Sequence, residues 1–198
     1  MQFETQRLIL RDWYPREDAR HAMDIFGDER VMAWVEGDVR DGSMRQVQAR
    51  LQRYAEQTKR SKDGMRSWAV VQKDIGRVIG NVVLCWLPDM EEVRKQHTPE
   101  PIEDGMSTDF VEIGWHFRPS SWGFGYATEA AGCIARHSFE TLDVPMLLAV
   151  TQPDNRRSIA VMEKLGMQYG GITTRCYGGR VLSLYTLKAS GLRLAEAE

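Results

Sequence analysis

The sequence has few of the features that mark specialised classes of protein. Its three cysteines, Cys85, Cys133 and Cys176, are odd in number and widely scattered, which predicts reduced thiols and no disulfide framework. Neither these cysteines nor the four histidines show metal-ligand spacing, so we expect no metal site. The chain has no run of about 18 apolar residues, and its first residues lack the pattern of a signal peptide. We therefore expect a cytoplasmic protein without membrane contact.

An excess of charge of one sign is also missing. The formal net charge is -2, whereas sequence-independent binding to nucleic acid needs a strong excess of Lys and Arg on one face. We therefore expect no nucleic-acid partner. The composition, 42% hydrophobic and 27% charged, is that of an ordinary globular chain. Because no repeat or low-complexity segment interrupts it, we predict a single domain over residues 1–198.

The sequence does contain alternating strand and helix patterns. Strands are predicted at 7–13, 66–73, 77–87, 110–117, 146–152, 168–177 and 180–187, and helices at 16–26, 43–58, about 127–142 and 155–166. This alternation predicts a layered α/β sandwich. Residues 88–109 have no periodicity and contain three prolines, so we expect a loop that is longer than most connections.

The string PSSWGFGYATEAA places Gly123 and Gly125 directly before a run of strong helix formers. Glycine is favoured where φ is positive or where another group approaches the backbone closely. The first N–H groups of the helix have no intrahelical partners, so the turn is a candidate anion site. A P-loop would need Lys and Ser or Thr where Tyr126 and Ala127 stand, and a dinucleotide fingerprint would need glycine in place of Thr128. A pyrophosphate held without a magnesium site remains, as in coenzyme A.

Four segments, TQRLILRDW, EIGWHFRPSSWGFGYATEAA, PDNRRSIAVMEKLGM and LSLYTL, resemble the GNAT family of acyl-CoA-dependent N-acetyltransferases. The resemblance is closest to the branch that includes the ribosomal-protein N-terminal alanine acetyltransferases, and it spans nearly the whole chain. It implies one GNAT domain of the α/β (α+β) class, whose central twisted sheet is mixed and mostly antiparallel, with about seven strands flanked by about four helices. The implied co-substrate is acetyl-CoA, with no metal.

The resemblance also assigns the pyrophosphate of coenzyme A to the glycine turn. The family motif begins with Arg or Gln, whereas this chain has Ser120, so we expect backbone N–H groups to form the cradle. Any cation must come from elsewhere, and Arg118 and Arg156 are nearest in the sequence. The residues expected to contact the cofactor here are Ser120, Trp122, Gly123, Phe124, Gly125, Tyr126 and Ala127.

Asn155 and Ser158 are implied to lie beside the pantetheine arm. Asp154 or Asn155 also suits the N-cap of a helix, and the two roles are compatible. Many relatives carry a tyrosine seven positions after the asparagine that protonates the departing thiolate, but this chain has Met162 there. Ser158, one helical turn earlier on the same face, is the candidate acid, with water as the alternative.

The candidate base is Glu112, which stands where this branch often carries an acidic residue and would accept the proton of the amine through water. A paired or rim carboxylate is the structural alternative. His116 lies two pleats further on the same face, unless a bulge disturbs the count, and a packed or solvated histidine is its structural alternative. An α-amine, with a pKa of about 7.7 to 8, needs less help than a lysine amine with a pKa of about 10.4.

Three functions stay open from the sequence. The first is acetyl transfer to a primary amine by direct attack in a ternary complex, with a protein N-terminus or a small molecule as the acceptor. The second is acetylation of an antibiotic or polyamine, which the acidic residues of 88–109 favour weakly, because Arg94 and Lys95 lie among them. The third is a non-catalytic acyl-CoA sensor. We expect residues 88–109 to border the acceptor side or a subunit contact, and a homodimer stays open.

Overall fold

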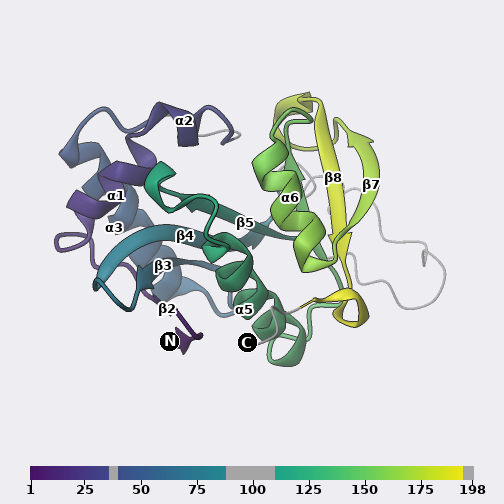
Figure 1. Cartoon of the computed structure of the whole chain (residues 1–198), viewed down its shortest axis with the longest axis horizontal. Coiled ribbons are helices and arrows are strands. Elements are labelled where there is room, and N and C mark those ends of the chain that lie inside the picture. The colour runs from purple at the N-terminus through teal and green to yellow at the C-terminus, as the bar shows by residue number, and fades with distance from the viewer. Residues whose placement is uncertain (36–39, 88–109, 194–198) are drawn as a thin grey trace.

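The computed structural model describes residues 1–35, 40–87 and 110–193. Its strands are β1 (Phe3–Glu4), β2 (Leu8–Arg11), β3 (Arg66–Gln72), β4 (Arg77–Trp86), β5 (Val111–Phe117), β6 (Leu147–Thr151), β7 (Gln168–Thr173) and β8 (Leu182–Leu187). They form one 8-stranded sheet in the order β1-β2-β3-β4-β5-β6-β8-β7 (Figure 1). Neighbouring strands are antiparallel, except that β5 and β6 are parallel.

The described helices begin and end at residues that suit those positions. They are α1 (Ala19–Phe26), α2 (Glu29–Met32), α3 (Met44–Arg60), α5 (Tyr126–Glu140) and α6 (Arg156–Leu165), with 3-10 turns η1 (Pro119–Ser121), η2 (Tyr177–Gly179) and η3 (Ala189–Gly191). At the start of α3, the Ser43 side chain accepts a hydrogen bond from the Gln46 N–H at 3.3 Å. At the end of α6, Gly166 takes the left-handed conformation with φ 86°.

The helices cover both faces of the sheet. Alternate residues of β3 point to opposite faces, so Trp68 and Val70 join the apolar core that includes α5 and α6, while Ala69 and Val71 join the core that includes α1 and α3. Figure 1 shows α5 and α6 together in front of the sheet, with α6 beside β8. This layering leaves the first turns of α5 and α6 next to each other and next to β5.

The predicted α/β fold with a mixed, mostly antiparallel sheet is confirmed. The structure adds the two-residue β1 and the four-residue α2, both too short to give a periodic signal. The predicted strand 168–177 is too long, because β7 ends at Thr173 and the chain then turns through Tyr177, which has a positive φ of 51°. Residues 88–109, for which we expect a long loop, lie outside the described residues.

The parallel strands β5 and β6 pair over a short distance only. They are in register at Val111 with Leu147 and at Glu112 with Leu148, whereas β4 and β5 pair from one end of β5 to the other. Within the described residues, therefore, the edge of β5 that faces β6 has no ladder partner after Glu112. The strands diverge from this point, and the opening between them is where the cavity described below lies.

No helix in the described ranges is both long and apolar enough to cross a membrane. Across the same ranges, no group of three or more His, Cys, Asp and Glu residues is placed to hold a metal ion. Cys85, Cys133 and Cys176 are all free thiols.

Candidate active site

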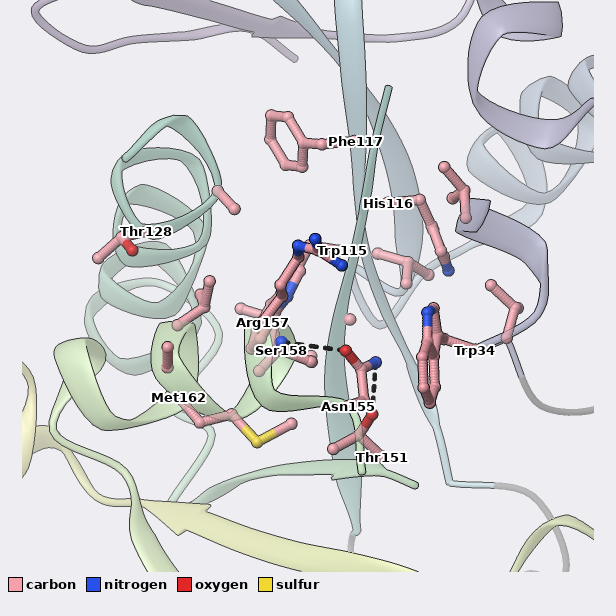
Figure 2. A pocket seen from close by; sticks show the side chains of 18 of the residues that line it. Trp34, Trp115, His116, Phe117, Thr128, Thr151, Asn155, Arg157, Ser158 and Met162 are labelled. Atoms are coloured by element: carbon pink, nitrogen blue, oxygen red, sulfur yellow. Dashed lines mark hydrogen bonds between the residues drawn. The ribbon is translucent and has the colours of Figure 1, made fainter. Parts of the chain in front are cut away.

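A cavity of about 880 Å³ lies where β5 and β6 diverge and extends toward both faces of the sheet. Its walls come from β5, from the glycine turn and first turn of α5, from the start of α6, and from the region of α2 and α3. The lining residues that the sequence singled out are Glu112, His116, Trp122, Gly123, Gly125, Tyr126, Ala127, Asn155, Ser158 and Met162. Segments that lie far apart in the sequence thus meet around one space (Figure 2).

The glycine turn has the backbone that its sequence suggests. Gly123 and Gly125 have φ values of 85° and 80°, a backbone conformation that residues with a side chain rarely adopt. A Cβ placed on Gly123 would have no atom within 4 Å, so this wall of the cavity is open where a ligand would approach. The first N–H of α5 bonded within the helix is that of Glu129, which donates to the Gly125 carbonyl at 3.0 Å. The preceding N–H groups of the helix have no intrahelical acceptor.

The cation that lines the cavity beside this turn is one that we did not select from the sequence. Arg157, in the first turn of α6, lines the cavity, and its guanidinium lies 4.7 Å from the centre of a ring of Trp122. Arg118 and Arg156, which are nearer in sequence, do not line it. Because Arg157 lies about thirty residues after the glycines in the chain, only the packing of α6 against α5 brings it there.

Two of the residues expected to contact the cofactor point elsewhere. Ser120 is exposed and does not line the cavity, whereas its neighbour Ser121 lines it and donates its hydroxyl to the Arg118 carbonyl at 2.8 Å. Phe124 is 60% exposed and stacks on Tyr126, with ring centres 5.8 Å apart. The part of the turn that faces the cavity therefore consists of backbone groups and of glycines, which have no side chain to block a ligand.

Asn155 ties the end of β6 to the start of α6. Its Oδ1 accepts a hydrogen bond from the Ser158 N–H at 3.3 Å, and its Nδ2 donates to the Thr151 hydroxyl at 2.9 Å (Figure 2). This is the N-cap that the sequence suggests. Met162, one turn after Ser158, is 1% exposed and belongs to the main apolar core, so an apolar side chain fills the position where many relatives have a tyrosine.

Glu112 lies at the last paired position of β5 and β6, and the residue is 7% exposed. The Tyr177 hydroxyl donates to its Oε2 at 2.6 Å, and the Cys85 thiol donates to the same oxygen at 3.8 Å. Burial raises the pKa of Glu112 from 4.5 to about 7, against the opposing effect of hydrogen bonds from Tyr177, Cys85 and the backbone of Val150. The carboxyl group can therefore exchange a proton near neutral pH.

Tyr177 is a site residue that the sequence did not reveal. It comes from η2, in the connection between β7 and β8, and it lines the cavity beside Glu112. Burial and the neighbouring Glu112 raise the pKa of Tyr177, so its hydroxyl keeps its proton and acts as a donor to the carboxylate. The only hint in the sequence is its place directly before two glycines.

The ring of His116 is held by a buried hydrogen-bond chain. The Trp13 indole N–H donates to the Asn81 Oδ1 at 3.0 Å, which directs the amide nitrogen of Asn81 toward the His116 Nδ1 at 3.2 Å. Because both the indole and the amide nitrogen can only donate, Nδ1 is the acceptor and the neutral ring carries its proton on Nε2. This tautomer makes His116 a donor rather than a base, which leaves Glu112 as the candidate base.

The strand count that places Glu112 and His116 on one face is valid. β4 and β5 pair in continuous register, with Cys85 opposite Glu112 and Asn81 opposite His116, and no bulge interrupts them. Figure 2 shows His116 and Trp34 on one side of the cavity, and Thr128 and Met162 on the other. The cavity therefore has two ends, one at the α5 and α6 termini and one near α2.

Comparison with known proteins places the chain in a family. It belongs to the GNAT acetyltransferases, because a family model described as an acetyltransferase (GNAT) domain matches residues 7–168. Membership makes the chain an acetyltransferase, as its glycine turn suggests. The "Uncharacterized N-acetyltransferase YnaD" of Bacillus subtilis is 27% identical over 176 residues, which cover 89% of this chain and 88% of that protein.

Solved structures share the fold over nearly the whole chain. The ribosomal-protein-S5-alanine acetyltransferase from Vibrio fischeri superposes with a TM-score of 0.69 at 16% identity, covering 98% of this chain and 99% of that one. RimJ from Mycobacterium smegmatis, solved in complex with CoA-disulfide, gives a TM-score of 0.69 at 18% identity, covering 92% of this chain and 82% of that one. At these identities the likeness establishes the fold.

Proposed function

We propose that this acetyltransferase moves the acetyl group of acetyl-CoA to a primary α-amine by direct attack, with Glu112 as the general base. The observation that carries the proposal is one cavity whose lining includes both the glycine turn, a candidate anion site, and the buried carboxyl of Glu112, whose pKa is raised to about 7. A non-catalytic sensor would need the cradle alone. The chemistry of Glu112 therefore favours an enzyme.

The residues present fit coenzyme A at the α5 end. The pyrophosphate suits the unpaired N–H groups after Gly125, and Arg157 supplies a cation beside them. The pantetheine arm suits the edge of β5 after Glu112, whose backbone groups have no ladder partner in the described chain. That a structure of RimJ holds a form of CoA in the same fold supports this assignment.

In the proposed reaction the amine nitrogen forms a bond to the thioester carbonyl carbon, and the bond from that carbon to sulfur breaks. Glu112 accepts a proton of the amine through a water molecule, and Tyr177 holds the carboxylate in place. The departing thiolate takes a proton from water, either directly or through the hydroxyl of Ser158, which lines the cavity and regains a proton from solvent as it gives one up. No covalent intermediate on the protein is needed.

The properties of the cavity favour an α-amine as the acceptor. The pKa of the Glu112 carboxyl, about 7, lies about one unit below the pKa of an α-amine but more than three units below the pKa of a lysine amine. Among the described lining residues, the side chains with a full positive charge are Arg30, Arg157 and Lys164, and the one carboxyl is Glu112. A polyamine or a polycationic antibiotic would meet more repulsion than attraction on these walls.

A panel of acceptors tests this function. Release of the coenzyme A thiol should follow addition of a peptide with a free N-terminus, and blocking that N-terminus in the same peptide should abolish it. A peptide with a blocked N-terminus and one internal lysine should react more slowly, because its amine is mostly protonated near neutral pH. Rapid turnover of spermidine with no turnover of any free N-terminus would contradict the assignment.

A further inference from the structure

Arg7, in the turn between β1 and β2, contacts the glycine turn although it lies more than a hundred residues away in the chain. We propose that Arg7 is a positioning residue for the pyrophosphate of coenzyme A: together with Glu129 it holds the turn at Gly123–Gly125 in its binding conformation and neutralises the carboxylate behind it. The proposal rests on the proposed binding of coenzyme A at this turn.

The contacts form a clamp, by which we mean Arg7, Glu129 and the groups that they bind. The Nε of Arg7 donates to the Glu129 Oε2 at 2.7 Å, and its backbone N–H donates to Oε1 at 2.9 Å. The Thr5 hydroxyl also donates to Oε1, at 2.6 Å. The Nη1 of Arg7 donates to the carbonyl of Phe124 at 3.0 Å, and the guanidinium lies 4.7 Å from the ring centre of Tyr126.

The carbonyl that Arg7 holds belongs to the residue between the two glycines. Glycines in the left-handed region have more accessible conformations than other residues, so this turn loses more entropy when it is fixed. A hydrogen bond from a charged donor to the Phe124 carbonyl removes that freedom before the ligand arrives. A turn that is ordered in advance binds its ligand more tightly.

Charge gives the clamp a second role. Glu129 lies in the first turn of α5, close to the N–H groups that face the anion, and its side chain is 11% exposed. An unpaired carboxylate here would repel a pyrophosphate, because salt screens a mostly buried charge only weakly. Arg7 pairs with it at 2.6 Å and is itself 41% exposed, so its charge reaches the solvent side of the turn.

The alternative is that the clamp only ties the N-terminal strands to α5. The chain offers a matched control, because Arg11, the last residue of β2, makes the same kinds of contact four residues further along the chain. Arg11 donates to both carboxyl oxygens of Asp18, at 2.7 and 2.8 Å, and its guanidinium lies 4.2 Å from the ring centre of Tyr14. The two residues differ in their remaining hydrogen bond: the Nη1 of Arg11 donates to the Asp12 carbonyl at 2.9 Å, whereas that of Arg7 donates to the Phe124 carbonyl in the glycine turn.

The test titrates coenzyme A and pantetheine, which lacks the pyrophosphate, into the wild-type protein, Arg7→Met, Arg7→Lys and Arg11→Met. The fluorescence of the tryptophans that line the cavity reports binding, and circular dichroism confirms folding. We expect Arg7→Met to weaken coenzyme A binding about 10-fold or more and to leave pantetheine affinity unchanged. The coenzyme A affinity of Arg7→Lys should lie between those of the wild type and Arg7→Met, because lysine keeps the positive charge but lacks the several planar N–H donors of the guanidinium.

Arg11→Met should lose thermal stability while both affinities stay at the wild-type values. Equal coenzyme A affinity in Arg7→Met and the wild type would overturn the clamp and leave the proposed function standing. The clamp would also be overturned if Arg7→Met lost the same factor in affinity for coenzyme A and for pantetheine, or if Arg11→Met lost as much coenzyme A affinity as Arg7→Met. If Arg7→Met does not fold, an unchanged coenzyme A affinity in Arg7→Lys overturns the clamp. A wild-type protein that binds no coenzyme A overturns the proposed function and the clamp together.

Discussion

Replacing Glu112 by Gln should change both the activity and its dependence on pH. The wild-type carboxyl must be ionised to accept a proton, and its pKa is raised by burial to about 7. Below this pH, each unit should lower the contribution of the base about tenfold. The ratio of wild-type to Glu112→Gln kcat/KM should therefore rise about tenfold per unit from about pH 5 to 7 and then level off at about 10² to 10⁴. The ratio cancels the titration of the acceptor amine, which both proteins share.

The same substitution has a signature in stability. Between pH 4.5 and about 7 the folded protein keeps a proton on Glu112 that the unfolded chain has released, so the free energy of unfolding falls as the pH rises through this window. A rise in pKa from 4.5 to about 7 corresponds to a loss of about 3 kcal/mol at higher pH. Gln has the same shape without the ionisation, so Glu112→Gln should lack this decrease.

Two measurements decide the matter. Thiol release across the pH range gives the ratio of kcat/KM, and urea unfolding at low and high pH gives the free energies. A ratio that does not vary with pH would refute Glu112 as the base. An unchanged pH dependence of unfolding in Glu112→Gln would refute the raised pKa on which the argument depends.

Further predictions concern the neighbours of the base and the acid. Tyr177→Phe removes the hydrogen bond to the Glu112 carboxylate, so the acidic limb of kcat/KM should move about one unit to higher pH; a limb that stays in place would show that the contact does not matter in solution. Ser158→Ala should lower kcat about 10 to 10²-fold with little change in acetyl-CoA affinity, and Met162→Tyr added to that variant should recover rate. Wild-type kcat in Ser158→Ala would remove the serine from the chemistry.

The fold and the glycine turn at one end of the cavity could be predicted because their signals are local. Glycine is favoured at positions 123 and 125 because both have a positive φ, and the residues that follow them are strong helix formers. The cap at Asn155 and the end of α6 at Gly166 are likewise set by short-range rules. Such features are visible in one sequence before any packing is known.

The rest of the site depends on packing that a single sequence does not display. Arg157 reaches the cavity because α6 packs beside α5, and Tyr177 reaches Glu112 because a turn folds back over β5. The tautomer of His116 depends on Asn81, which lies in β4, and on Trp13, which lies just after the end of β2. Ser120 shows the converse: its place in the motif suggested a ligand contact, but η1 directs Ser121 into the cavity instead.

The most direct test of the central claim is calorimetric titration of coenzyme A into Gly123→Val, with Gly76→Val as its control. Both glycines have a positive φ, 85° and 62°, and neither has an atom within 4 Å of an added Cβ, but only Gly123 lines the cavity. Both substitutions therefore place a side chain at a positive φ in open space, but only the one at Gly123 places it in the cavity. We predict wild-type affinity in Gly76→Val and at least about tenfold weaker binding in Gly123→Val. Unchanged coenzyme A affinity in a folded Gly123→Val protein would contradict the account.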